Sequence, residues 1–170
     1  MEEKFILDAN SFIEPYRIYY PFDLASSFWR QMFDCITNNE NVIILDVVYK
    51  EILRLDGELS VWMKNIPKNK IINQLNKITI EIYADIIKFI ITSGYYRQEA
   101  ARVWTANLVA DPWIISYASY SNATIITHEK KRILYLTAKS KIVKIPEVAD
   151  RFNIKCENLF YFMRKNKIYL

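Results

Sequence analysis

The sequence predicts an α/β fold in which a mostly parallel central sheet lies between two layers of helices. The first observation is a set of short, near-continuous apolar runs of strand length, such as VIIL at residues 42–45. The second is that segments with apolar residues at helical spacing separate these runs. Strands that are apolar on both faces and alternate with helices are typical of parallel sheets covered on both sides. We therefore expect a three-layer α/β/α architecture.

The first two strands and the helix between them follow from local pattern. Residues 4–7 (KFIL) form an apolar run of strand length at the start of the chain. Residues 22–36 carry apolar side chains four positions apart, which predicts an amphipathic helix. The polar turn NNEN then leads into residues 42–45 as the second strand.

The middle of the chain predicts a run of helices. Residues 47–55 place an apolar stripe on one helical face, and residues 59–65 continue the helical pattern up to a proline. Residues 76–93 form a long apolar segment that a Ser-Gly pair ends in the manner of a helix C-cap. Residues 98–108 also predict a helix.

The last third of the chain returns to alternating elements. An Asp-Pro pair predicts the start of a helix over residues 111–120. Residues 124–127 (TIIT) predict a third strand, and residues 141–145 (KIVKI) a fourth that the next proline ends. Residues 147–152 and 156–164 predict two helices in the tail.

Composition narrows the class of protein. With 170 residues, of which 52% are hydrophobic and 25% charged, the chain predicts one globular domain rather than a disordered protein. Only two glycines occur, and the phosphate-binding patterns GxGxxG and GxxxxGK[ST] are absent from the sequence. These observations argue against a P-loop NTPase or a dinucleotide-binding enzyme.

Net charge and targeting signals bear on the protein's partners and its cellular compartment. The net charge of +4 is compatible with a polyanionic partner but too small to identify one. The N-terminal MEEKFILDAN carries acids where a signal peptide needs basic residues. No run approaches the roughly 18 apolar residues of a membrane span, and the two cysteines lack the spacing of a metal site. We expect a soluble cytoplasmic protein with no membrane partner.

The most informative residues are four acids at the junctions between predicted elements: Asp8, Glu51, Asp111 and Glu129. Two directly follow predicted strands, and two lie in the first turns of predicted helices. Sites in parallel sheets form beyond the carboxyl ends of the strands, so all four could reach one edge. If the fold gathers them, they form an oxygen-rich site for Mg²⁺ or Mn²⁺.

Each of the first two acids also has a purely structural interpretation. Asp8 could be a turn residue or a helix cap, although Asn10 could support it as a ligand through its amide group. Glu51 lies beside the apolar stripe of its predicted helix, where a carboxylate is costly without a cation or hydrogen bonds. Its structural alternative is a boundary glutamate that reaches water. Asp46, directly after the second strand, could join the rim of the site.

The other two acids have structural alternatives as well. Asp111 precedes a proline, so it could cap the predicted helix and still offer one oxygen to a metal. Glu129 could simply pair with the basic residues that follow it. Thr127 and His128 could hydrogen-bond a substrate phosphate or a metal-bound water. A general-base role for His128, the only histidine, finds no partner motif around it.

The order of these motifs resembles the PIN domain family of metal-dependent ribonucleases, which includes the VapC-type toxins. FILDANSFI is similar to the family's first strand, whose Asp supplies the first metal-binding acid. VIILDVVYKEIL resembles the second strand and its helix, with Glu51 as the second acid. ADPWIISYA resembles the helix start that carries the third acid, and TIITHEKKR the strand end that usually reads Thr-x-Asp.

The chain departs from that pattern at Glu129, where the family usually has aspartate. The extra methylene could still let the carboxylate assist through a water. The resemblance implies one PIN-like domain over residues 1–170, of a distinct branch. Its additions would be a helical insertion at about residues 14–40 and a helical tail at about residues 147–170.

The resemblance also implies an activity. Asp8, Glu51 and Asp111 would hold one or two Mg²⁺ or Mn²⁺ ions with the help of Glu129, and water activated by metal would hydrolyse RNA. The protein would be an endoribonuclease and the toxin component of a toxin–antitoxin system. The sequence contains no Ser-His-Asp pattern that would suggest a nucleophilic side chain instead.

Candidate partners follow from basic and aromatic residues. Lys130, Lys131 and Arg132 adjoin the proposed site, and Tyr135 nearby could stack on a base, so RNA contact is expected. The structural alternative is a solvated basic turn. An early aromatic-rich segment could be core, or could serve a homodimer or an antitoxin helix.

Two other functions compete with the ribonuclease hypothesis. A non-catalytic PIN-like module that binds RNA or protein would explain the departure at Glu129. A phosphohydrolase of the dehalogenase type needs a second Asp two residues after its nucleophile, and Asn10 occupies that position.

Overall fold

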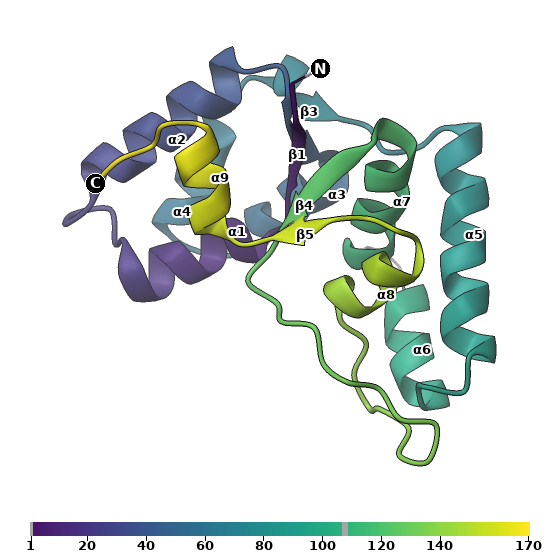
Figure 1. The fold of residues 1–170 in the computed structure, drawn as a ribbon. Helices are drawn as coiled ribbons and strands as arrows, with labels where there is room; N and C mark the ends of the chain where they lie inside the picture. The colour runs from purple at the N-terminus through teal and green to yellow at the C-terminus, as the bar shows by residue number, and fades with distance from the viewer. Residues whose placement is uncertain (1, 107–108) are drawn as a thin grey trace.

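The computed structural model describes residues 2–106 and 109–170, and a five-stranded sheet in the order β3-β2-β1-β4-β5 crosses its centre (Figure 1). Every neighbouring pair of these strands is parallel. The strands are β1 (Lys4–Leu7), β2 (Val42–Leu45), β3 (Ile71–Ile72), β4 (Ala123–Ile126) and β5 (Cys156–Glu157).

The sheet is parallel because its inner strands are apolar on both faces. All four residues of β2 and of β4 are buried, as are the last three residues of β1. Such strands must be covered by helices on both sides, and burying each Ile or Leu side chain stabilises the fold by about 1.5–3 kcal/mol. The predicted α/β architecture with a parallel central sheet is confirmed.

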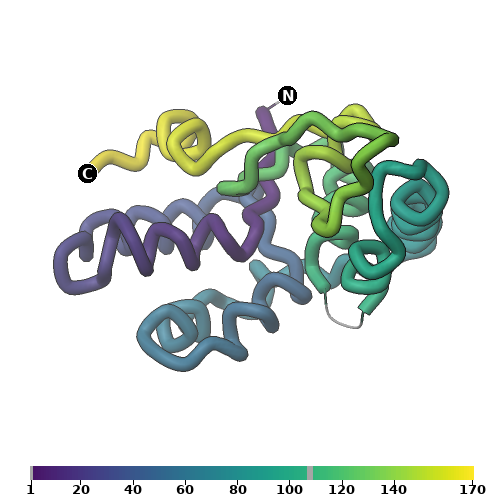
Figure 2. The backbone as a smooth tube through the Cα atoms, turned by 90° about the horizontal axis from the view of Figure 1, so that it is seen from below, coloured from purple at the N-terminus to yellow at the C-terminus, as the bar shows by residue number. Residues whose placement is uncertain are grey.

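One layer of helices covers the face on the left of Figure 1, and Figure 2 shows the same grouping from below. It contains α1 (Asn10–Glu14), the π-helical segment η1 (Pro15–Tyr19), α2 (Ser26–Asn38), α4 (Glu58–Lys64) and α9 (Leu159–Lys165). The helix α3 (Asp46–Leu53) leads from β2 toward α4, and the 3-10 segment η2 (Lys68–Lys70) leads into β3.

The second layer covers the opposite face of the sheet (Figures 1 and 2). It contains α5 (Lys77–Thr92), α6 (Gln98–Thr105), α7 (Asp111–Ser121) and α8 (Ile145–Arg151). The α7 helix packs on β1 and β4 from this side. The two layers with the sheet between them form the expected three-layer arrangement.

The early aromatic-rich segment is mostly core. Phe22 stacks on Trp29 with ring centroids 4.4 Å apart, and Trp29 meets Trp62 edge-on at 5.1 Å. Trp29 is only 2% exposed, whereas Tyr19 at the end of the π-helical segment is 55% exposed. The aromatic content of this region therefore stabilises the left-hand layer. Within the described residues, no helix combines the length and the apolar character needed to cross a membrane.

The prediction of a strand at residues 141–145 is wrong. Val143 is buried and Ile142 is exposed, which imitates strand alternation, but Ile145 already begins α8. Pro146 favours the first helical turn because its fixed φ suits that position. The strands that extend the sheet at either side, β3 and β5, are two residues long and were not predicted. The predicted helix 156–164 is likewise wrong at its start, where β5 lies instead.

Helix boundaries otherwise differ from prediction by a few residues. The helix predicted from residue 22 begins at Ser26, and the helical insertion predicted at about residues 14–40 corresponds to the end of α1, η1 and α2. The end predicted at residue 108 falls outside the described residues. The tail from residue 147 contains β5 between two helices.

The fold determines where a site can form. The chain builds β1, β2 and β3 toward one side and then returns to place β4 on the other side of β1. This reversal leaves a crevice beyond the carboxyl ends of β1 and β4, where parallel sheets bind their ligands. Asp8 follows β1 and Thr127 follows β4, so both lie at this crevice.

Candidate active site

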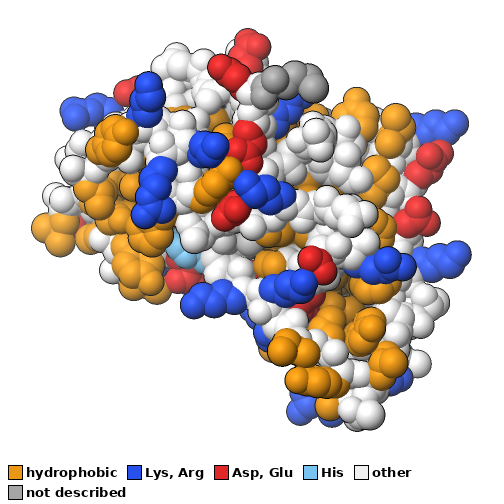
Figure 3. Space-filling view, in the orientation of Figure 1, with side chains coloured by type: hydrophobic (Ala, Val, Ile, Leu, Met, Phe, Trp, Pro, Cys, Tyr) orange, Lys and Arg blue, Asp and Glu red, His pale blue; other side chains and the backbone are white. Residues whose placement is uncertain are grey.

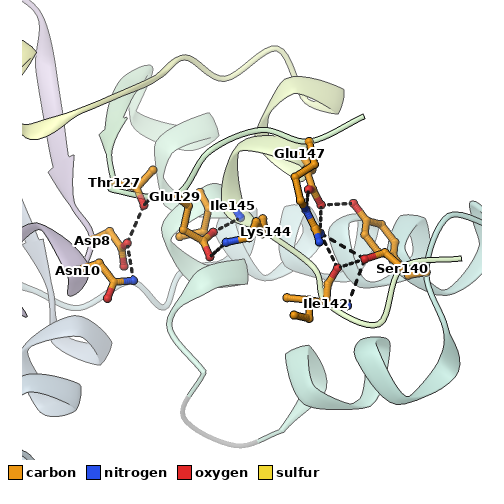
Figure 4. Close-up of polar contacts among 11 residues, drawn as sticks. Asp8, Asn10, Thr127, Glu129, Ser140, Ile142, Lys144, Ile145 and Glu147 are labelled. Carbon is orange, nitrogen blue, oxygen red and sulfur yellow. Dashed lines mark hydrogen bonds and ion pairs between the residues drawn. The ribbon is translucent and has the colours of Figure 1, made fainter. Parts of the chain in front are cut away.

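Asp8 is the acid at the centre of the crevice, and neighbouring side chains fix its orientation (Figure 4). It is 2% exposed. Its Oδ2 accepts a hydrogen bond of 2.8 Å from the Thr127 hydroxyl and one of 3.4 Å from the Asn10 amide. The support expected from Asn10 is present. Thr127 also faces Asp8, so its hydroxyl positions the carboxylate from the neighbouring strand.

Asp111 is carried to the same crevice by α7. The expectation that it caps this helix is wrong, because Ala110 occupies the N-cap position and Asp111 is the first helical residue. Pro112 follows within the first turn, where a missing N–H costs nothing. Burial raises the pKa of Asp111 to about 8, with further increases from the charges of Asp8, Glu129 and Glu51.

Glu51 approaches from α3. Val48 and Ile52, on either side of it in the helix, are fully buried, so the prediction of an apolar stripe beside this carboxylate is confirmed. Glu51 itself is half-buried. Burial raises its pKa, and the positive charge of Arg54 opposes that increase.

The four predicted acids lie near enough for their charges to act on one another. Burial raises the pKa of Asp8 to about 7 against the hydrogen bond from Thr127, and the charges of Glu129 and Glu51 raise it further. Within residues 2–106 and 109–170, no Lys, Arg or His forms an ion pair with Asp8, Glu51 or Asp111. A buried group of like charges is unfavourable unless protons or a cation neutralise it.

Glu129 differs from the other three acids, because its carboxylate has partners of its own (Figure 4). Its Oε1 lies 3.2 Å from Lys144 Nζ, and its Oε2 accepts a 2.7 Å hydrogen bond from the N–H of Ile145. Across the described part of the chain, no three His, Cys, Asp or Glu side chains form a ready-made metal site. The acids are neighbours, but Glu129 is turned toward the start of α8.

The donor set nevertheless suits a hard divalent cation. Asp8 is buried and Asp111 is half-buried; removal from water raises the pKa of both carboxyl groups, the charges of Glu129 and Glu51 add to the increase, and Glu51 adds a third carboxylate. Mg²⁺ and Mn²⁺ prefer carboxylate oxygens. Such an ion would compensate for the loss of water around these carboxylates and for the repulsion between their charges. These three acids could hold it, with Asn10 and Thr127 supporting Asp8.

His128 lies beside this group without joining it. Burial lowers its pKa, and the nearby charge comes from Glu14 on α1 rather than from the four acids. Its Nε2 has no hydrogen-bond partner within the described residues. With Thr127 and Glu129 it lines a cavity of about 600 Å³, and Figure 3 shows the chain's histidine in pale blue at the surface.

The predicted basic residues have three different environments. Lys130 lines the same cavity as His128. Lys131 pairs with Asp150 at 2.7 Å, and both side chains are more than half exposed. Arg132 grips the fully buried carboxylate of Glu147 and donates to the carbonyl of Ile142 at 2.9 Å. Arg132 therefore stabilises the long loop between β4 and α8. Lys130 is exposed to solvent at the cavity.

Replacing Arg132 should destabilise the protein strongly. Arg132→Ala leaves the buried carboxylate of Glu147 without its cation, which costs about 3 kcal/mol in the free energy of unfolding. In a chain of this size that loss lowers the melting temperature by roughly 6–12 °C. Lys131→Ala is the matched control, because an exposed ion pair contributes less than about 1 kcal/mol. Equal melting temperatures for the two variants would contradict this role of Arg132.

The sequence placed Lys144 among the basic residues expected to contact nucleic acid but did not connect it with Glu129. It lies 15 residues after Glu129 in a loop, and nothing in the local pattern connects the two. The local feature that could have drawn attention to Lys144 is its position directly before the Ile-Pro start of α8. Asp46 pairs with Lys50 at 2.6 Å within its own helix, which accounts for its charge locally.

Comparison with known proteins gives one family match. A family model described as "Domain of unknown function (DUF4411)" matches residues 5–170. No curated protein matches the chain. The matched region includes every residue of the site described above.

Proposed function

The chain belongs to the DUF4411 family, and from its acidic crevice we propose that it is a metal-dependent endoribonuclease. One observation carries the proposal: Asp8 is 2% exposed and Asp111 is half-buried at the switch point of a parallel sheet, and neither has a cationic partner among the described residues. Ionised carboxylates at such a position destabilise the fold. Perturbed carboxylates in a crevice are typical of functional sites, and binding a divalent cation would explain their presence here.

The order of acids along the chain supports the assignment to ribonuclease chemistry. Asp8 after β1, Glu51 on α3 and Asp111 at the start of α7 occupy the positions that the resemblance to PIN domains predicts. The parallel sheet with helices on both faces agrees with that resemblance. We propose that the chain is a PIN-like domain and the toxin component of a toxin–antitoxin pair.

The protein's own residues would have distinct tasks. Asp8, after β1, and Asp111, at the start of α7, would bind Mg²⁺ or Mn²⁺ as carboxylates, with Glu51 from α3 as the third acid. Thr127 and Asn10 would keep the Asp8 oxygens aimed at that position, as outer-shell partners do in metal sites. The bound ion would lower the pKa of a water and stabilise charge on the phosphate during hydrolysis.

RNA as substrate is supported by the surroundings of the site. Lys130 lines the cavity next to the acids, together with the exposed aromatic side chains of Tyr19 and Phe160. A lysine can contact a phosphate, and aromatic rings can stack on unpaired bases. Figure 3 shows Lys and Arg side chains in blue, together with red acidic ones, on the face where the pale-blue histidine is visible.

The direct test is cleavage of a labelled, unstructured RNA with and without metal. We expect cleavage in Mn²⁺ or Mg²⁺ and none in EDTA. Asp111→Asn should reduce the metal-dependent rate by more than about 100-fold, because even outer-shell changes cost 10–100-fold. Glu81→Gln, which removes an exposed acid on α5 away from this cavity, is the matched control and should cleave normally. Unchanged cleavage by Asp111→Asn would sink the proposal.

A second candidate is a PIN-like module that binds RNA or protein without cleaving it. The observation in its favour is that Lys144 and the N–H of Ile145 engage both oxygens of Glu129, the acid that departs from the family pattern. This alternative predicts RNA retention in a binding assay with no cleavage under any divalent metal.

A further inference from the structure

The pair formed by Glu129 and Lys144 is built into the site more firmly than an ordinary surface ion pair. The Glu129 side chain is 20% exposed and that of Lys144 is 28% exposed, whereas the Lys131–Asp150 pair is 56% and 61% exposed. The second oxygen of Glu129 is also held, by the 2.7 Å hydrogen bond from Ile145. Both oxygens are therefore directed toward the loop before α8.

A short chain of hydrogen bonds connects this pair to the acidic group (Figure 4). The N–H of Glu129 donates to Thr127 Oγ1 at 3.1 Å, and the same hydroxyl donates to Asp8 at 2.8 Å. The backbone at Glu129 is thus fixed two hydrogen bonds away from Asp8. The Glu129 side chain then leads to Lys144, whose ammonium group lies 3.2 Å from Glu129 Oε1.

The positive charge of Lys144 would offset the repulsion between the acidic site and a negatively charged substrate. The acids in the crevice repel a polyanion, and Lys144 is held beside one of them, Glu129, with N–H donors to spare. An ammonium group has three N–H donors, of which the described contacts use one, on Glu129. It is also a compact charge suited to contact one phosphate oxygen.

We propose that Glu129 is a positioning residue and not a metal ligand: it holds Lys144 where the ammonium group contacts a phosphate of the bound nucleic-acid strand. This inference rests on the proposed function for the identity of the strand. It assigns the metal to Asp8, Asp111 and Glu51, and it explains the departure from aspartate, since the extra methylene lets the carboxylate reach the start of α8.

The role of Glu129 is tested by metal binding without any RNA. We expect isothermal titration with Mn²⁺ to give the same affinity for Glu129→Gln as for the wild-type protein, within about twofold. Asp8→Asn should weaken binding by more than about tenfold in the same titration. Glutamine can still accept the Ile145 N–H, so this variant should keep its fold. If Glu129→Gln weakened Mn²⁺ binding as much as Asp8→Asn does, the assignment would be overturned.

The role of Lys144 is tested by the salt dependence of RNA binding in EDTA, measured by fluorescence anisotropy with a labelled single-stranded RNA. Losing one phosphate contact lowers the slope of log K against log salt by about 0.7. We expect Lys144→Gln to show this decrease and a weaker affinity. Lys165→Gln is the control, because that lysine lies 3.8 Å from Glu3, which precedes β1 at the opposite edge of the sheet.

A double variant separates positioning from direct contact. Glu129→Gln should lower RNA affinity less than Lys144→Gln, and the two changes together should match Lys144→Gln alone, because Glu129 acts through the lysine. A slope for Lys144→Gln equal to that of the wild-type protein, or additive losses in the double variant, would overturn the proposal. Absence of RNA binding by the wild-type protein would instead remove the proposed function and the lysine contact together, while the Mn²⁺ titration still decides the role of Glu129.

Discussion

Asp8→Asn is expected to abolish metal-dependent RNA cleavage and, at the same time, to make the metal-free protein more stable. The activity should fall by more than about 100-fold, because the variant removes a charge that the proposed metal requires. The stability should rise at pH 8, because burial and the charges of Glu129 and Glu51 make ionised Asp8 unfavourable in the folded state. An asparagine at this position can still accept the Thr127 hydrogen bond.

The two effects are measured on the same protein samples. RNA cleavage in Mn²⁺ gives the activity, and thermal unfolding in EDTA at pH 8 gives the stability. Glu81→Gln serves again as the control for removing a carboxylate, and it should change neither quantity markedly. A variant of Asp8 that loses activity because it unfolds would show a lower melting temperature, which contradicts the expectation of an intact and stabilised fold.

The metal-free protein should lose stability as the pH rises from 6.5 to 9, and Mg²⁺ should restore it. The folded state raises the pKa of Asp8 to about 7 and that of Asp111 to about 8, from ordinary values of 3.8. The folded state therefore holds protons that the unfolded chain has released. The stabilisation from these groups is complete below pH 3.8 and is lost as the pH rises through about 7 and about 8.

The size of the effect follows from the size of the pKa shifts. Each unit of pKa difference corresponds to about 1.4 kcal/mol, so the loss across this window is on the order of 3 kcal/mol in the free energy of unfolding. Urea unfolding at pH 6.5 and pH 9, with EDTA or with Mg²⁺, measures it. Asp111→Asn should show a smaller pH dependence and little stabilisation by Mg²⁺. Equal stability of the wild-type protein at both pH values in EDTA would refute the coupling of the buried acids.

Most of the fold could be predicted because its signals are local. The apolar runs that became β1, β2 and β4 need no distant information, since a strand that is apolar on both faces has to be central. The helices α3, α5 and α7 follow from apolar spacing and from an Asp-Pro or Ser-Gly boundary. The two-residue strands β3 and β5 could not be predicted, because two residues carry no periodicity and pair only when the rest of the sheet is present.

The misassigned strand at residues 141–145 illustrates the same limit. Its alternation of buried and exposed residues is genuine, since Val143 is 4% and Ile142 57% exposed. The N–H of Ile145 is taken by Glu129, and Pro146 favours a helical turn, so the segment leads into α8. Ile145 begins this helix and donates its N–H to a residue 16 positions earlier, a contact that the local pattern does not contain.

The sequence by itself singled out four acids as site candidates and predicted at which ends of which elements they lie. Their convergence also followed, because the carboxyl ends of parallel strands meet at one edge. Only the tertiary structure decided their electrostatic state: burial and mutual repulsion raise the pKa values of Asp8 and Asp111, while Lys144 neutralises Glu129. That distinction depends on distances across the chain and on exclusion from water, which no local pattern of residues contains.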